Sequence, residues 1–212
     1  MKPLSECRLY AFVDTAYLRG RPAGLIAEQL CEGGADIIQL RAKASTPAEV
    51  QRLAEEVLPV TRRAGIRLVI NDHLSVAAAV GAELCHLGQE DFFEAGFTHV
   101  SQLPRTDSSP GVGLSTHAPA QADRALQAEP DYIAIGPVFA TGTKPTARPV
   151  TLDYVRWAAE HVTIPWFAIG GVNLQTIDQV LAAGATRICV VSAILNPDDV
   201  AGACRAYRER LA

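Results

Sequence analysis

The chain has 212 residues, of which 49% are hydrophobic and 20% are charged, with a formal net charge of −4. This length suffices for one domain with a full core, so we expect a single domain over residues 1–212. The acidic balance argues against a nucleic-acid-binding protein, whose affinity comes from clustered Lys and Arg, but it permits a small anionic ligand.

Two further features predict where the protein works. No apolar stretch reaches the ~20 residues of a membrane-spanning helix, and the first residues lack the apolar core of a signal peptide. The five cysteines form an odd set without a Cys-x-x-Cys pair, which argues against a disulfide framework or a zinc site. We therefore expect reduced thiols, no membrane partner and a cytoplasmic location.

Short β-branched apolar runs recur along the chain, and each is followed by a polar or glycine-containing loop. Near-continuous apolar runs of this kind are typical of a parallel sheet that is covered by helices. The expected strands are Leu9–Val13, Asp36–Leu40, Arg67–Ile70, Glu83–Leu87, Gly111–Leu114, Tyr132–Ile135, Trp166–Ile169 and Arg187–Val191.

Longer amphipathic segments rich in Ala and Leu lie between these runs and are predicted to be helices. They are Gly24–Glu32, Pro47–Arg63, Leu74–Val80, Pro119–Gln127, Leu152–His161, Thr176–Ala182 and Pro197–Arg210, with a short helix and a loop expected within Phe92–Pro110. Eight strands in strict alternation with about eight helices favour closure into a single (β/α)8 barrel over an open doubly wound sheet.

Polar residues follow the second expected strand in strict alternation. Gln39, Arg41 and Lys43 are two residues apart, which places all three side chains on one face at the mouth of the barrel. Two cations on one face repel unless an anion lies between them, so we interpret this segment as an anion site. The alternative is a strand end whose charges are simply solvated.

Carboxylates follow the third and fourth strands. Asp72 and Asp91 come from adjacent strand ends and could share a magnesium ion, which needs only one or two carboxylates beside a phosphate. The alternatives are ordinary turn chemistry at Asn71 and Asp72, and helix capping by Glu90 or Asp91.

The fifth strand is followed by Ser115, Thr116 and His117. The pattern resembles a nucleophile elbow, but that motif requires Gly where this chain has His117, so a hydrolase pair is not favoured. Ser115 is expected to bind a ligand or to cap the helix that begins at Pro119.

The last three strands are followed by candidate phosphate-binding loops. Gly136–Pro145 ends in Thr141, Gly142, Thr143 and Lys144, which offer hydroxyls, backbone N–H groups and a cation, without the spacing of a Walker A loop. Gly170-Gly171 and Val191-Ser192 follow the seventh and eighth strands, where barrels of this class bind phosphate. For the glycine pair, a tight turn is the alternative.

Taken together, the chain resembles the thiamine-phosphate synthase family from Leu9 to its last helix. The motifs in register are Gln39-Leu40-Arg41-x-Lys43, Asn71-Asp72, Gly88-Gln89-Glu90-Asp91, Gly113-x-Ser115-x-His117, Gly136-Pro137-x-x-x-Thr141-x-Thr143-Lys144, Gly170-Gly171 and Val191-Ser192. The resemblance implies a (β/α)8 barrel that transfers hydroxymethylpyrimidine from its diphosphate to thiazole phosphate, or to the carboxylated thiazole phosphate. It also implies a magnesium requirement, small-molecule substrates and possible homo-oligomers.

The resemblance further implies individual roles. Residues matching the diphosphate substrate's site are Gln39, Leu40, Arg41, Ala42, Lys43, Asn71, Ser115 and Lys144, of which Arg41, Lys43, Ser115 and Lys144 are implied to be catalytic. Residues matching the thiazole site are Thr141, Gly142, Thr143, Gly171, Val191 and Ser192, and the implied magnesium ligands are Asp72 and Asp91. Two departures are Ala42, where the family often has an acid, and Thr151, where it often has Gly.

Three alternatives remain at this stage. The related thiazole tautomerase depends on a His near the fifth strand, which His117 could supply, but it needs no diphosphate clamp. A non-catalytic regulator that binds thiazole phosphate would be suggested by loss of Asp72, Asp91 or Lys144, and all three are present. Other phosphate-handling barrels need a catalytic Lys/Glu set or a metal-binding His set at the strand ends, and this sequence has neither.

Overall fold

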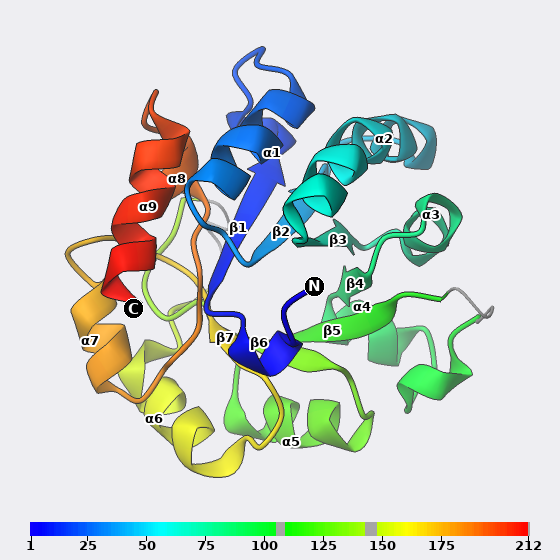
Figure 1. Cartoon of the computed structure of the whole chain (residues 1–212). Coiled ribbons are helices and arrows are strands. Elements are labelled where there is room, and N and C mark those ends of the chain that lie inside the picture. The colour runs from blue at the N-terminus through cyan, green and yellow to red at the C-terminus, as the bar shows by residue number, and fades with distance from the viewer. Residues whose placement is uncertain (105–108, 143–147, 212) are drawn as a thin grey trace.

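The computed structural model describes residues 1–104, 109–142 and 148–211, and it forms a closed barrel (Figure 1). Eight parallel strands pair in sequence order from β1 to β8, and β8 closes against β1, as predicted. The strands are β1 Leu9–Asp14, β2 Ile37–Arg41, β3 Arg67–Asn71, β4 Leu84–Leu87, β5 Gly111–Thr116, β6 Tyr132–Ile135, β7 Trp166–Ala168 and β8 Ile188–Cys189.

Helices surround the barrel, and they match most of the predicted segments. They are α1 Ala23–Glu32, α2 Pro47–Ala64, α3 Leu74–Val80, α4 Gln89–Glu94, α5 Pro119–Gln127, α6 Thr151–His161, α7 Ile177–Ala182, α8 Ser192–Leu195 and α9 Val200–Arg210, with 3-10 turns η1 Leu4–Glu6, η2 Thr15–Tyr17 and η3 Val100–Gln102. The start of α2 is set by Thr46, whose side chain accepts a hydrogen bond from the Glu49 amide while the Glu49 carboxylate accepts from the Thr46 amide. In the described residues, no helix is both long enough and apolar enough to cross a membrane.

The predicted helix Pro197–Arg210 is wrong at its beginning. The structure has a four-residue α8 before it, and α9 starts only at Val200, because the Asp199 side chain caps it by accepting from the Gly202 amide at 2.8 Å. The segment Phe92–Pro110 contains η3, and its first helix, α4, already begins at Gln89.

Thr151 begins α6 with a left-handed backbone, at φ +64°. A β-branched side chain is strained in this region, whereas Gly adopts it freely. The Gly that the resemblance leads one to expect here therefore suits the backbone better than the Thr that is present.

Aromatic rings fill the barrel interior. Tyr10 packs edge-on against Phe167 at 5.4 Å between ring centroids, and Tyr132 packs against the same ring at 5.7 Å. Tyr132 fits only because Gly113 lies opposite it on β5: a Cβ at that position would lie 2.1 Å from the Tyr132 ring. The interior is thus a packed core rather than a channel.

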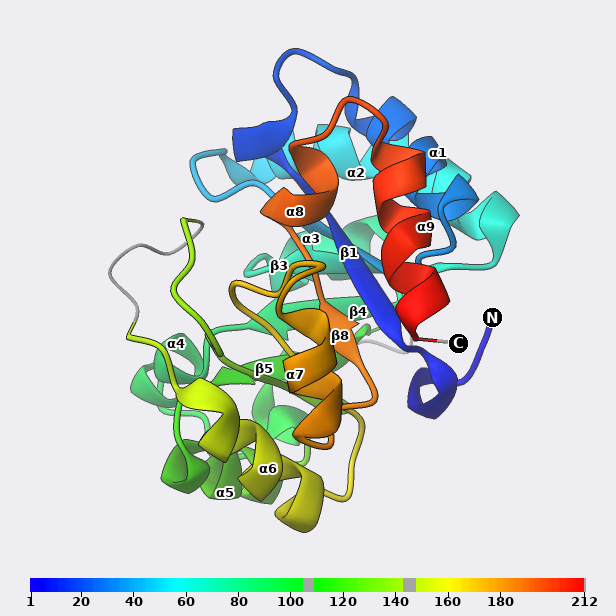
Figure 2. The ribbon, with the colours of Figure 1, turned by 90° about the vertical axis from the view of Figure 1, so that its left-hand side faces the viewer.

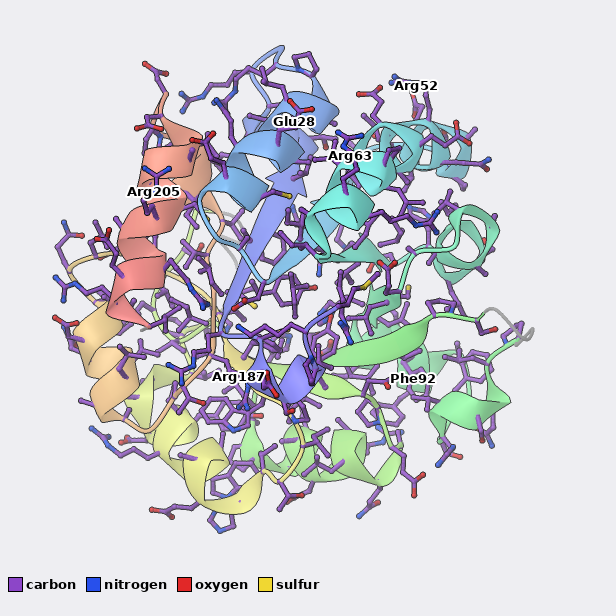
Figure 3. The ribbon with its side chains drawn as sticks, viewed as in Figure 1. Glu28, Arg52, Arg63, Phe92, Arg187 and Arg205 are labelled. Carbon is purple, nitrogen blue, oxygen red and sulfur yellow. The ribbon has the colours of Figure 1, made fainter. Side chains whose placement is uncertain are left out.

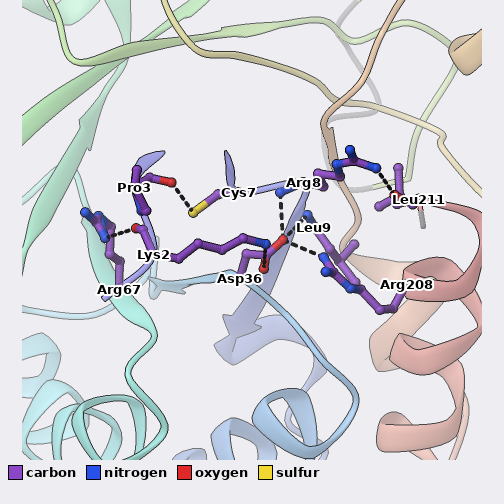
Figure 4. A network of polar contacts seen from close by, with 9 residues as sticks. All are labelled: Lys2, Pro3, Cys7, Arg8, Leu9, Asp36, Arg67, Arg208 and Leu211. Atoms are coloured by element: carbon purple, nitrogen blue, oxygen red, sulfur yellow. Dashed lines mark hydrogen bonds and ion pairs between the residues drawn. The ribbon is translucent and has the colours of Figure 1, made fainter. Parts of the chain in front are cut away.

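The amino-terminal end of the barrel is closed by the first residues of the chain. The largely buried Asp36 carboxylate accepts from the Lys2 ammonium at 2.8 Å, from the Arg8 and Leu9 amides, and from Arg208 at 2.8 Å (Figure 4). Burial disfavours its charge, but these donors outweigh burial and hold the pKa of Asp36 below its ordinary value. Figure 2 shows the amino terminus at this end of β1, with α8 toward the other end.

The outer helices are also joined by ion pairs. Arg63 on α2 lies 3.7 Å from Glu28 on α1 (Figure 3). Arg205 on α9 lies 3.4 Å from Glu32. These pairs are exposed, so they add little to stability. The barrel is therefore held by its core and by the closed amino-terminal end, which leaves the opposite end available for a site.

Candidate active site

A pocket lies at the carboxyl ends of the strands, where barrel enzymes place their active sites. Every strand or the loop that follows it contributes to the lining. The residues are Tyr10, Phe12, Gln39, Arg41, Lys43, Asn71, Asp72, His86, Gly88, Glu90, Asp91, Ser115, His117, Ala134, Gly136, Pro137, Thr141, Ile169, Gly170, Gly171, Val172, Cys189, Val191 and Ser192.

The segment after β2 alternates as predicted. Gln39, Arg41 and Lys43 line the pocket, whereas Leu40 and Ala42 are 0% and 4% exposed and are not among its lining. Of the five residues assigned to the substrate from the resemblance in this segment, the structure therefore brings three side chains to the pocket. Ala42 is not part of the site, so its departure from the family pattern leaves the lining unchanged.

Each cation of this segment has a carboxylate partner. Arg41 donates to Asp14 at 2.7 Å, and Lys43 donates to Asp72 at 2.6 Å. The two cations therefore do not need an anion between them, contrary to the prediction, because each is already paired with a carboxylate. Asp14 was missed, although an acid at the end of the apolar run Leu9–Val13 was the available signal.

The two ion pairs differ in their surroundings. The Asp14 side chain is 1% exposed and that of Arg41 is 15%, whereas Lys43 and Asp72 are 47% and 30% exposed. The first pair is buried, and of its two residues Arg41 lines the pocket. The second is solvated, so its partners exchange at low cost when a ligand arrives.

The two predicted magnesium ligands, Asp72 and Asp91, line the same pocket. Asp72 has a left-handed backbone at φ +66°, and its amide donates to the His86 carbonyl at 2.9 Å. Backbone strain of this kind often accompanies functional positions. Within the described ranges, no group of three His, Cys, Asp or Glu residues could hold a metal by itself. Two carboxylates in one pocket nevertheless suit magnesium, which keeps waters and phosphate oxygens as its other ligands.

Ser115 and His117 do not form a hydrolase pair. The Ser115 hydroxyl accepts a long hydrogen bond, at 3.4 Å, from the backbone amide of Gln89. The His117 ring bonds through Nδ1 to the Gly136 carbonyl, and its backbone amide donates to Gln121. The cap of α5 is Ala118, without a side-chain hydrogen bond, so Ser115 is not the helix cap either.

The loops after β6 and β7 run together at the other side of the pocket. The Val138 and Phe139 amides donate to the Ile169 and Gly170 carbonyls at 2.8 and 3.0 Å. Gly170 has φ +99°, and a Cβ there would lie 2.3 Å from Pro137, so this close approach requires glycine.

The thiazole-site candidates are divided by the structure. Thr141, Gly171, Val191 and Ser192 line the pocket, whereas Gly142 is exposed and is not among the lining residues. Thr143 and Lys144 lie outside the described residues.

Comparisons with known proteins agree with this geometry. Residues 9–194 match the family model described as thiamine monophosphate synthase. Thiamine-phosphate synthase of Thermus thermophilus is 45% identical over 185 residues, which cover 87% of this chain and 86% of that protein. The enzyme of Halalkalibacterium halodurans is 38% identical over 205 residues, covering 96% and 95% of the two chains.

Solved structures show the same relation. Thiamine phosphate pyrophosphorylase from Pyrococcus furiosus superposes with a TM-score of 0.82 at 26% identity, covering 99% of this chain and 98% of the other. A 3-hexulose-6-phosphate synthase, at a TM-score of 0.65 and 21% identity, shares the fold. These relatives favour the synthase over the tautomerase and the non-catalytic regulator. With a family model matched from the first strand to α8, the chain belongs to the thiamine monophosphate synthase family.

Proposed function

We propose that the pocket joins hydroxymethylpyrimidine, delivered as its diphosphate, to thiazole phosphate and releases thiamine phosphate and pyrophosphate. The chain is accordingly a transferase, as its curated relatives are. One observation carries the proposal: the ends of β2 to β4 bring two cations, an amide and two carboxylates into a single pocket. They are Arg41, Lys43, Asn71, Asp72 and Asp91.

The pyrimidine diphosphate is assigned to the side of the pocket formed by β2, β3 and β5. Gln39 and Asn71 are 3% and 8% exposed, so their amides suit the ring and the inner phosphate rather than solvent. Arg41 and Lys43 are nearer the mouth, where they would contact the diphosphate together with Ser115. Lys144 is assigned here from its sequence motif.

Magnesium is the proposed cofactor, and Asp72 and Asp91 would hold it. When bound, it would neutralise charge on the diphosphate as the leaving group forms. Asp72 accepts a hydrogen bond from Lys43, so a cation held by this carboxylate would compete with Lys43. Lys43 would then be free to contact the diphosphate.

Thiazole phosphate is assigned to the opposite side of the pocket. Gly171, Val191 and Ser192 would hold its phosphate, through backbone N–H groups and the Ser192 hydroxyl, and Thr141 would approach the ring. Thr143 is assigned here from its sequence motif. This arrangement leaves the thiazole nitrogen between the two sites. A carboxylated thiazole phosphate would use the same contacts, and an assay with both compounds distinguishes them.

The chemistry requires no protein nucleophile. The C–O bond between the pyrimidine methylene and the diphosphate breaks, its electron pair leaves with pyrophosphate, and the cation-like pyrimidine is captured by the lone pair of the thiazole nitrogen. Arg41 and Lys43 bind the departing charge more strongly as it develops, so they stabilise the transition state more than the ground state.

The direct test supplies purified protein with both substrates and magnesium, and measures thiamine phosphate and pyrophosphate in equal amounts. The matched variants are Arg41→Met, which removes a cation from the pocket, and Arg52→Met, which removes one from the exposed face of α2, where Arg52 pairs with Glu56. We expect product with the parent and with Arg52→Met, and a large loss with Arg41→Met. Absence of product with the parent would overturn the proposal. The cytoplasmic location and a homo-oligomer stay predictions.

A further inference from the structure

A continuous chain of hydrogen bonds crosses the barrel interior and includes three residues that line the pocket. The Gln39 Nε2 donates to the Tyr10 hydroxyl at 2.6 Å, and the Tyr10 and Tyr132 hydroxyls are 3.0 Å apart. The Tyr132 hydroxyl in turn lies 3.0 Å from His86 Nδ1. Four strands, β2, β1, β6 and β4, each contribute one residue, so the chain joins distant sides of the barrel.

The two tyrosines at its centre are isolated from water. Tyr10 is 1% exposed and Tyr132 is 0% exposed, and both rings pack against Phe167. Burial raises the pKa of both phenols well above their ordinary value, with neighbouring groups as smaller contributions. Each hydroxyl therefore keeps one proton, and each donates one hydrogen bond.

Because each hydroxyl has a single proton, the chain has a direction. Either hydroxyl could donate across the Tyr10–Tyr132 contact, but one direction gives every proton of the chain an acceptor. Gln39 donates to the Tyr10 oxygen, so in this direction the Tyr10 proton is directed to Tyr132. The Tyr132 oxygen then accepts from Tyr10, and its proton is directed to His86 Nδ1. Nδ1 is an acceptor in this arrangement, so a neutral His86 has its proton on Nε2.

We propose that Tyr10, Tyr132 and His86 are positioning residues that fix the orientation of the Gln39 side-chain amide, with Nε2 toward Tyr10 and Oε1 toward the ligand. They would thereby set the pocket's preference for an amino-substituted ring. The proposal rests on the proposed function, which places the pyrimidine at Gln39. With Nε2 held by Tyr10, the amide oxygen is presented as an acceptor for the ring's amino group. The second N–H of the amide is available to the adjacent ring nitrogen.

A ring with an oxo group in place of the amine has the opposite pattern. Its exocyclic oxygen is an acceptor and would face the Gln39 amide oxygen, which is also an acceptor. Its adjacent ring nitrogen is a donor and would face the Gln39 N–H, which is also a donor. Rejection is strong when a buried polar group is left unpaired. Turning the amide over would accommodate this ring, but the reversed amide oxygen would then face the Tyr10 oxygen unless the whole chain reversed.

The variant that isolates this effect is Tyr132→Phe. Tyr132 is part of the chain but is not among the described residues that line the pocket, so it acts only through its neighbours. Tyr154→Phe is the matched control: its hydroxyl is also buried and donates to Thr116 at 2.8 Å, outside the chain. Each substitution removes one buried phenol hydroxyl from the core; the Tyr132 hydroxyl makes two of the hydrogen bonds described and the Tyr154 hydroxyl one.

The first measurement is the ¹⁵N spectrum of histidine-labelled protein without substrate, with the His86 signals assigned by their loss in His86→Asn. We expect His86 to be protonated at Nε2 in the parent and in Tyr154→Phe, and to become a mixture of tautomers in Tyr132→Phe. A parent with its proton on Nδ1, or an unchanged spectrum in Tyr132→Phe, would overturn the proposal.

The second measurement compares kcat/KM for the amino and the oxo pyrimidine diphosphates. We expect Tyr132→Phe to reduce the amino preference by about 10-fold or more, and Tyr154→Phe to keep the parent's ratio. An equal ratio in all three proteins, or an equal fall in both variants, would refute the positioning role. If the parent makes no product from the amino compound, the proposed function fails instead, and the spectrum still tests the hydrogen-bond chain.

Discussion

The two ends of the barrel both contain paired charges, but they use them differently. At the amino-terminal end, Asp36 receives four donors and its side chain is 9% exposed. At the carboxyl end, Lys43 and Asp72 form a single pair that is 47% and 30% exposed. A buried charge with several hydrogen-bond partners stabilises its end of the barrel. An exposed charge with a single partner can exchange that partner for a ligand. The predictions below test this division.

The largest effect is expected for Arg41→Met, at the carboxyl end. Turnover should fall by about 10²- to 10³-fold, because the variant loses a cation that stabilises the leaving group. Stability should fall as well, since Asp14 is then left buried without its partner. Adding Asp14→Asn should restore stability but not turnover, as measured by thermal unfolding and pyrophosphate release. Recovery of turnover in the double variant would show that Arg41 is purely structural.

Asp72→Asn and Asp91→Asn should be next in size, each with turnover reduced by about 10- to 100-fold at low magnesium. The two carboxylates are proposed to share one ion, so the double variant should be little worse than either single one. Titrating turnover against magnesium should partly rescue the singles and rescue the double variant least. Losses that multiply and do not depend on magnesium would contradict a shared ion.

Asp36→Asn tests the amino-terminal end and should affect stability rather than catalysis. We expect a loss of about 2 kcal/mol at pH 7 with kcat nearly unchanged, because a largely buried, charged acceptor is lost from its donors. Since the pKa of Asp36 is lowered in the folded state, its stabilisation is present above the unfolded pKa and disappears as pH falls through the folded one. The difference from the parent should therefore shrink below about pH 4.

The control for this experiment is Asp153→Asn, because Asp153 is 88% exposed and pairs with Arg156 three residues away. Its unfolding free energy should match the parent within about 0.5 kcal/mol at every pH. A fall in kcat for Asp36→Asn, in protein that is fully folded, would show that the two ends are coupled.

His117→Ala should reduce turnover by less than about 10-fold, since the proposed reaction assigns no proton transfer to this imidazole. Its ring bonds to the Gly136 carbonyl and lies 3.9 Å from Glu90, so a small loss of order at the pocket rim is expected. Steady-state kinetics with both substrates measures it. A near-total loss of turnover in folded protein would show that His117 acts as a general acid or base.

The smallest effect is expected for Thr151→Gly. Relief of the left-handed backbone should raise the unfolding free energy by about 1 kcal/mol, reduced somewhat by the greater freedom of Gly in the unfolded chain. Thr151→Ala should give much less, since Ala is also disfavoured at φ +64°. Chemical denaturation of the three proteins decides this, and an equal gain for Ala and Gly would remove the backbone explanation.

The barrel could be predicted from sequence because each strand is a compact apolar run and each helix a longer amphipathic one. The alternation of Gln39, Arg41 and Lys43 likewise determined which side chains reach the pocket. The partners of these residues could not be predicted. Asp14 and Arg41 are 27 residues apart, and Tyr10 and Tyr132 are 122 apart, so their contacts exist only once the barrel has closed. The start of α9 at Val200 instead of Pro197 depends on one cap, at Asp199.

Gly113 shows how the absence of a Cβ in one strand can determine the position of a side chain in the next. The Tyr132 ring occupies the space that a Cβ at position 113 would fill, at 2.1 Å. An engineer who replaced this glycine with alanine, a routine choice in a strand, would displace a ring that reaches His86. If the positioning chain operates as proposed, a glycine of β5 influences which nitrogen of a neighbouring imidazole carries the proton. Ligand preference would then depend on a residue that does not contact the ligand.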